Sequence, residues 1–148
     1  KGPEILPYLE KISRVHGSHH PELYKVLDHF KETVKEMAEH MEEEEGYVFP
    51  LIKDIEKAAE TGVASDELKK TTLGSPIQKM MDEHLAEGDR FREIEKLTNG
   101  YTNPPDGCNT YHVTMQLLKE FEADLHLHIH LENNILFPRA IELEQKLN

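Results

Sequence analysis

The chain has one cysteine, far fewer basic than acidic residues and no apolar run long enough to cross a bilayer. As a lone cysteine, Cys108 cannot form an internal disulfide, and no signal peptide precedes the first expected helix, so the expected location is the cytoplasm. Because 17 Lys and Arg stand against 29 Asp and Glu, the net charge is -12, and phosphate backbones and anionic membranes are poor partners. The sequence therefore predicts a protein that binds neither nucleic acid nor membranes.

What the sequence does contain is helical pattern almost throughout. Long stretches are rich in Glu, Lys, Leu, Met and Ala, and its 148 residues are enough for one domain with one core. Gly and Pro gather at two main breaks, 61–74 and 98–107, and a helix is expected to follow each of them. The first helix is expected to kink near Pro21 and to continue to Leu27, with the chain reversing around Asp28. This pattern predicts an all-α fold.

Apolar residues in these helices recur at a spacing of three and four, and polar residues interrupt the pattern at a few positions. In the fourth helix the apolar stripe comprises Leu118, Phe121, Leu125, His128, Glu132 and Ile135. In the second helix it comprises Phe30, Thr33, Met37, His40, Glu44, Tyr47 and Leu51. With His84 on the third helix and His16 on the first, each helix directs one histidine inward. Four such helices predict an up-down-up-down bundle with a metal site in its core.

One motif, HxxxExxxxFP, occurs twice, with its two copies 88 residues apart. The first copy begins with His40 and Glu44, and the second begins with His128 and Glu132. Residues four apart lie on one helical face about one turn apart, so each pair can hold the same ion. The proline ten residues after each histidine is expected to kink or end the helix just past the site.

Inward glutamates are the strongest indication of metal in this sequence. A buried carboxylate without a cation loses several kcal/mol of solvation, and two at one level repel each other. The predicted metal ligands are His16, His40, Glu44, His84, His128 and Glu132. If both glutamates bridge two ions, each ion receives two histidines and two carboxylate oxygens, and an oxo or hydroxo group makes five ligands. This donor set favours two iron ions, with manganese or zinc less suited.

The sequence gives weaker evidence that the other histidines bind metal. His126 and His130 alternate with His128 but lack its carboxylate partner, so they are expected to be half-exposed. His20 lies one turn from His16 and is the alternative first-helix ligand. Glu83, beside His84, is a candidate for a hydrogen bond that orients a ligand.

These motifs resemble those of a known family. The doubled HxxxE with its following FP, the EH pair that ends in His84 and the upstream RVHGSHH resemble the hemerythrin-like cation-binding domains. The chain is more closely similar to the repair of iron centres family, most specifically in HIHLENNILFPRA at 128–140, MDEH at 81–84 and NPPDGC at 103–108.

That resemblance implies one hemerythrin-like domain over residues 1–148, without the family's short N-terminal domain and its adjacent cysteine pair. It implies a non-haem di-iron centre with bridging Glu44 and Glu132 and with terminal histidines. It also implies repair of iron-sulfur clusters damaged by nitric oxide or peroxide, through supply of iron or handling of nitric oxide. Expected partners are dioxygen, nitric oxide or peroxide, and iron-sulfur client proteins.

Two other functions can be weighed against this one. A module that binds, stores or senses dioxygen or nitric oxide would show reversible spectral change without loss of iron. A histidine phosphotransfer bundle needs an exposed histidine near basic groups, whereas these histidines lie on core stripes. The sequence favours a metal-binding repair protein over a conventional enzyme, and leaves monomer and homodimer open.

Overall fold

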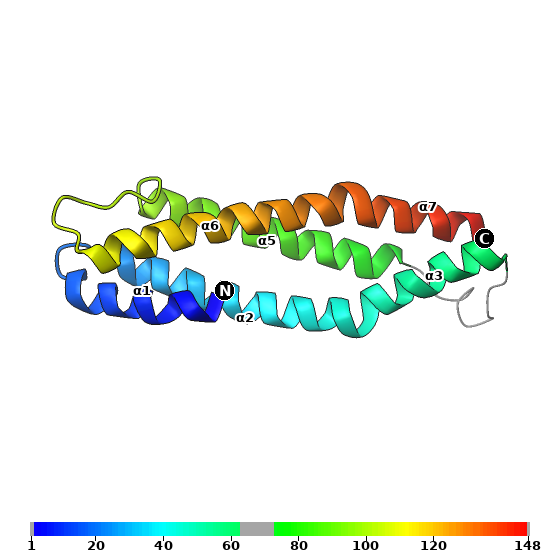
Figure 1. Cartoon of the computed structure of the whole chain (residues 1–148), viewed down its shortest axis with the longest axis horizontal. Coiled ribbons are helices and arrows are strands. Elements are labelled where there is room, and N and C mark those ends of the chain that lie inside the picture. The colour runs from blue at the N-terminus through cyan, green and yellow to red at the C-terminus, as the bar shows by residue number, and fades with distance from the viewer. Residues whose placement is uncertain (1, 63–72, 148) are drawn as a thin grey trace. The chain divides into compact units, whose positions relative to one another are not determined.

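A computed structural model describes residues 2–62 and 73–147 of the chain, and these residues form helices and turns (Figure 1). The elements in chain order are α1 (Gly2–His16), α2 (Glu22–Glu43), the π-helix η1 (Glu44–Val48), α3 (Phe49–Thr61), α5 (Gly74–Leu97), α6 (Asn109–Leu131), the π-helix η2 (Glu132–Leu136) and α7 (Phe137–Leu147). The predicted all-α fold and both main breaks are confirmed, although positions 63–72 of the first break lie outside the described residues. None of the described helices is long and apolar enough to span a membrane.

The first two helices meet at a short turn, earlier in the chain than the sequence predicts. Residues 17–21 form that turn, so the expected continuation through Pro21 to Leu27 and the reversal near Asp28 are wrong. The backbone N–H of Gly17 closes the last turn of α1, and a Cβ at this glycine would collide with the Tyr24 ring. Gly17 and Pro21 therefore lie in the turn between the two helices, and residues 22–43 form one helix.

The chain divides into two compact units, of which unit 1 comprises residues 1–37 and 86–126. Four helical segments build it: α1, the start of α2, the second part of α5 and most of α6. Successive segments run in opposite directions, in the predicted up-down-up-down order (Figure 1). Its fully buried side chains include Leu9, Ile12, Leu23, Val26, Phe30, Phe91, Ile94 and Leu118.

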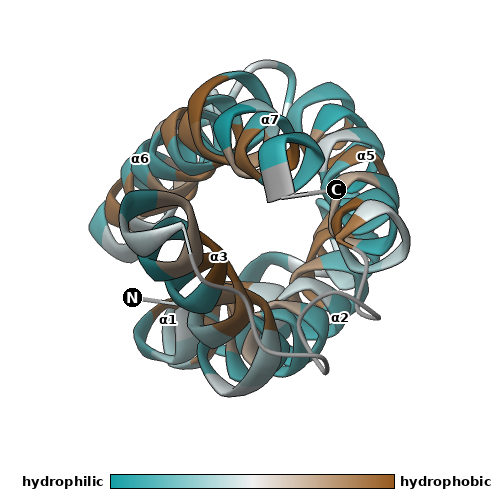
Figure 2. Cartoon of the chain, turned by 90° about the vertical axis from the view of Figure 1, so that its right-hand side faces the viewer, coloured by the Kyte–Doolittle hydropathy of each residue, from teal (hydrophilic) through white to brown (hydrophobic). Residues whose placement is uncertain are grey.

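Unit 2 comprises residues 38–85 and 127–148, and it contains both copies of the repeated motif. Its apolar core contains Val48, Ile52, Ile55, Leu73, Ile77, Met80, Phe137 and Ala140. Hydrophobic and hydrophilic segments alternate along the helices in Figure 2, as expected of helices with one buried face. This core fixes the segments on which the polar motif residues lie.

Each copy of the motif contains a π-helical turn that begins at its glutamate. The backbone N–H of Phe49 donates to the carbonyl of Glu44, and Phe137 donates to Glu132 in the same way. A wider turn also relieves the clash between a proline ring and the carbonyl four residues earlier. The extra residue rotates the following helix by about 100°. Tyr47 and Ile135, which the sequence places on the core stripes, are for this reason about half exposed, at 49% and 55%.

Unit 1 also buries one carboxyl group, that of Glu87. Glu87 is only 2% exposed. Arg90 Nη1 donates to Glu87 at 2.5 Å and to Glu36 at 2.8 Å. Burial and the neighbouring Glu36 together raise the pKa of Glu87 to about 7, against the opposing effect of Arg90. The hydrogen bond from Arg90 lowers the pKa of Glu36. Glu87 therefore keeps its proton to a higher pH than an ordinary glutamate does.

This proton makes stability depend on pH. Because the folded pKa of Glu87 lies above the unfolded value, its contribution is fully present below about pH 4.5 and is lost as the pH rises to about 7. The wild type is expected to lose about 2–3 kcal/mol more than Glu87→Gln between pH 5 and pH 8. Urea unfolding at several pH values measures this difference, with Glu93→Gln on the exposed face of α5 as the control. Parallel pH profiles for the wild type and Glu87→Gln would contradict the assignment.

Candidate metal centre

Five of the six predicted metal ligands converge in unit 2. Each offers one nitrogen or oxygen atom, and these atoms lie within 4.8 Å of one another. The residues come from five different elements: His40 on α2, Glu44 on η1, His84 on α5, His128 on α6 and Glu132 on η2. The side chains are buried apart from that of His128, which is 41% exposed. Although the His128 ring is partly exposed, its Nε2 atom is itself buried.

Glu132 lies at the middle of the group. Its Oε1 atom is 3.0 Å from Nε2 of His84, 3.1 Å from Nε2 of His128 and 3.8 Å from Nε2 of His40. Glu44 occupies the equivalent place in the other motif copy, with Oε1 2.7 Å from His40 Nε2 and Oε2 3.9 Å from His128 Nε2. Each carboxylate therefore faces histidines from more than one helix, as a bridging ligand must.

Two hydrogen bonds, each at an Nδ1 atom, orient the rings of His40 and His84. The Nδ1 atom of His40 lies 2.5 Å from Glu83 Oε2, and the Nδ1 atom of His84 lies 2.9 Å from Asn133 Oδ1. Both acceptors require the proton on Nδ1, which leaves Nε2 directed at the centre, where the two Nε2 atoms are 3.2 Å apart. The expected orienting role of Glu83 thus has a contact to support it.

Protons partly balance the negative charge of this group. Burial alone would lower the pKa of His40, but contacts with Glu132, Glu44 and Glu83 outweigh it and raise the pKa to about 10. Burial would raise the pKa of Glu132, yet His128, His40 and His84 together lower it. For Glu44, burial dominates and the pKa is raised. The group is thus a pair of buried carboxylates that attracts positive charge.

The donor set fits a metal. Within the described residues, Oε1 of Glu44, both carboxylate oxygens of Glu132 and Nε2 of His128 are buried and have no hydrogen-bond partner. The nearby histidine nitrogens are close enough for ion pairing, but their geometry does not make a hydrogen bond. Buried polar atoms without partners are rare, and a cation coordinated by them would remove the cost. The cluster can hold a metal.

The sixth predicted ligand, His16, lies at the end of α1 in unit 1. Its ring packs edge-on against Tyr111, and its Nε2 atom is buried without a hydrogen-bond partner in the described part of the chain. The alternative, His20, already has carboxylates on both ring nitrogens, Glu22 at 3.1 Å and Asp106 at 2.8 Å. His16 as a ligand stays a prediction from the sequence.

Two other histidines are more exposed than expected, and one contact was missed. His126 and His130 are exposed, and His130 Nδ1 is hydrogen-bonded to Asn134 at 2.9 Å. Asn133 was not among the predicted site residues. Its only sequence signal is its place directly after Glu132, because an asparagine on a helix has many ordinary roles.

Asn133 offers a direct test of the orienting contacts. Asn133→Ala removes the acceptor for the Nδ1 proton of His84 and is expected to lower metal affinity about 10- to 100-fold. Competition with a chromogenic chelator measures the affinity. Asn134→Ala is the matched control, because Asn134 lies in the same π-helix and is hydrogen-bonded to the exposed His130 instead of to a proposed ligand. Equal affinities for both variants would show that the Asn133 contact does not support His84.

Comparison with known proteins agrees with this geometry. The chain is 30% identical over 133 residues to the iron-sulfur cluster repair protein ScdA of Staphylococcus haemolyticus, which covers 90% of this chain and 56% of that protein. It is 34% identical over 142 residues to the iron-sulfur cluster repair protein YtfE of Yersinia pseudotuberculosis, which covers 96% of this chain and 58% of the relative. The chain thus spans a little over half the length of these relatives.

The family model described as hemerythrin HHE cation binding domain matches residues 3–140, which include every predicted ligand. The two HxxxE pairs lie in the matched region, and the structure brings both pairs together with His84. On this evidence the chain belongs to the hemerythrin HHE cation-binding domain family.

Proposed function

We propose that the centre in unit 2 holds two iron ions between His40, Glu44, His84, His128 and Glu132, with both glutamates as bridges. The observation that carries the proposal is the pair of buried carboxylates: Oε1 of Glu44 and both oxygens of Glu132 lack hydrogen bonds, and Oε1 of each glutamate faces histidine Nε2 atoms. Imidazole and carboxylate together suit iron.

The residues of the centre would have three roles: binding the ions, orienting the histidine rings and excluding water. The Nε2 atoms of three histidines and the oxygens of two glutamates bind the ions, and Glu83 and Asn133 hold two of the rings in the binding orientation. Apolar residues such as Phe137, stacked on His84 with centroids 6.2 Å apart, exclude water from the buried side. A bound pair of irons supplies one-electron chemistry and open coordination positions for a small ligand.

We further propose that the protein acts in the repair of iron-sulfur clusters damaged by nitric oxide or peroxide. Its support is the similarity to proteins named for that repair, together with the partial exposure of one proposed ligand. The His128 side chain is 41% exposed, whereas those of His40 and His84 are each 2% exposed. Because Nε2 of His128 is itself buried, a ligand or a chelating group that approaches on this side would have to displace the His128 ring to reach the iron.

The experiment is an iron-transfer assay with the purified iron-loaded chain. Iron is counted per chain, and the protein is mixed with an apo iron-sulfur protein, inorganic sulfide and a thiol reductant, with cluster assembly followed by visible absorption. We expect two irons per chain and formation of the cluster at the expense of bound iron. A parallel sample with redox-inert zinc in the centre is the control and is expected to restore no cluster.

The alternative, a module that binds dioxygen or nitric oxide, gives a different result in the same assay. It predicts a reversible spectral change on gas addition and removal, with iron retained in the presence of the acceptor. That outcome would contradict the repair proposal while leaving the di-iron centre intact. Iron analysis of His16→Ala separately tests the sequence-based prediction that His16 is a further ligand.

A further inference from the structure

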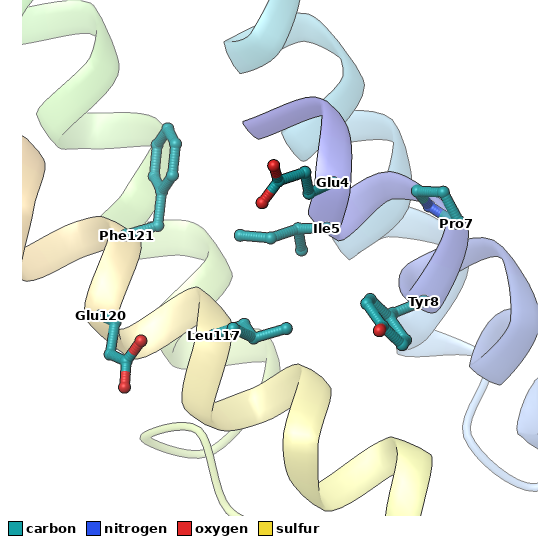
Figure 3. Close-up of a pocket in the computed structure, with 7 residues that line it drawn as sticks. All are labelled: Glu4, Ile5, Pro7, Tyr8, Leu117, Glu120 and Phe121. Atoms are coloured by element: carbon teal, nitrogen blue, oxygen red, sulfur yellow. The ribbon is translucent and has the colours of Figure 1, made fainter. Parts of the chain in front are cut away.

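Unit 1 contains a pocket that has no part in the metal centre. It lies between α1 and α6, has a volume of about 580 Å³ and is shown in Figure 3. The lining residues include Glu4, Ile5, Tyr8, Leu117, Glu120 and Phe121. In the close-up, Ile5 and Leu117 extend from facing helices into the space between them. The volume is within the range of small-molecule sites.

The apolar wall of this pocket is held in place by the core behind it. Ile5 is 3% exposed and forms part of that core. The Phe121 ring stacks on Phe91 at a centroid distance of 5.5 Å and meets Phe30 edge-on at 5.3 Å. At Gly2 an added Cβ would lie 3.5 Å from Phe121, so the start of α1 packs closely against this ring. A wall fixed in this way needs little rearrangement to receive a ligand.

The charged residues of the pocket are all acidic. Glu4 projects from α1 and Glu120 from α6, so the carboxylates come from both sides of the space (Figure 3). None of the residues that line the pocket is basic, and the whole chain carries a net charge of -12. An anion would be repelled, whereas a cation would be attracted. Tyr8, 44% exposed, adds an aromatic face that can also contact a cation.

We propose that this pocket binds a small organic cation with an apolar body, such as an aryl-alkyl ammonium ion. The apolar body occupies the space between Ile5, Leu117 and Phe121. The ammonium group lies toward Glu4 and Glu120, whose carboxylates remain partly hydrated at the pocket rim. The site is separate from the proposed iron function, because its residues belong to unit 1 and the metal cluster belongs to unit 2.

The test uses three probes of similar size with different charge: benzylammonium, benzyl alcohol and phenylacetate. Two-dimensional amide NMR of the full chain follows each titration at low ionic strength. We expect benzylammonium to shift the amides around Ile5 and Leu117 in a saturable way and to bind at least about fivefold more tightly than benzyl alcohol. Phenylacetate is expected to cause no saturable shift, and added salt is expected to weaken benzylammonium binding.

Two variants separate the contributions of charge and cavity. Glu4→Gln with Glu120→Gln is expected to weaken benzylammonium about five- to tenfold and to leave benzyl alcohol unchanged. Glu10→Gln with Glu93→Gln removes the same charge from exposed positions of unit 1 outside the pocket and is expected to have little effect. Leu117→Trp, which fills the space, is expected to abolish saturable shifts for both probes. Equal binding of all three probes, or shifts confined to residues away from the pocket, would overturn the proposal.

Discussion

Replacing Glu132 with alanine is expected to remove both iron ions from the centre. Its Oε1 atom lies within 3.1 Å of the Nε2 atoms of His84 and His128, so its loss takes a shared ligand from the whole group. A terminal ligand would instead affect one ion more than the other. Iron content per chain and the visible spectrum of the purified variant measure the effect.

Glu142→Ala is the matched control, because Glu142 lies exposed on α7, the helix that follows η2. Helical circular dichroism should be unchanged in both variants, because the apolar core of unit 2 is left intact. A Glu132→Ala protein that keeps one iron with a normal spectrum would make Glu132 a terminal ligand and would contradict the bridge.

Replacing Phe91 with alanine is expected to lower the free energy of unfolding by about 3–5 kcal/mol. The ring is fully buried in unit 1 and contacts both Phe30 and Phe121, so its removal leaves a cavity bordered by two aromatic rings. That loss is a large fraction of the about 5–15 kcal/mol that stabilises an ordinary domain. Urea unfolding followed by circular dichroism provides the measurement.

Leu85→Ala provides the control on the same helix, because Leu85 is 63% exposed and should change stability by less than about 0.5 kcal/mol. Phe91→Leu is expected to lose less than the alanine variant, since part of the cavity stays filled. Equal, small losses for both Phe91 variants would mean that the aromatic cluster of unit 1 is loosely packed and collapses easily.

Much of the candidate site could be predicted because its residues break a regular pattern. His40, Glu44, His128 and Glu132 stand on stripes that are otherwise apolar, and a helix fixes the direction of residues four apart. His84 could be added on the same reasoning from its own helix. The convergence of these five side chains therefore follows from local helical geometry together with the need to bury apolar residues.

Other features depend on contacts that one sequence does not record. Tyr47 and Ile135 are exposed because a π-helical turn changes the helical phase, and a strict spacing of three and four cannot show such a turn. The early end of α1 was missed because Pro21 was expected to kink the first helix, whereas the helix ends at His16 and the chain turns at residues 17–21. Asn133 forms a hydrogen bond with the His84 ring on another helix, and such a contact produces no periodic pattern in the sequence.

The π-helical turns also determine how long a stretch of chain must be transferred if this centre is to be built into another protein. A histidine and a glutamate four residues apart can be placed on any straight helix, but the chain beyond them would then continue with an unaltered phase. In this protein Phe137, immediately after η2, reaches the core only because of the additional residue in that turn. The smallest portable piece is thus the stretch from His128 to Pro138 or its counterpart from His40 to Pro50, and shortening either by one residue would turn its downstream helix outward.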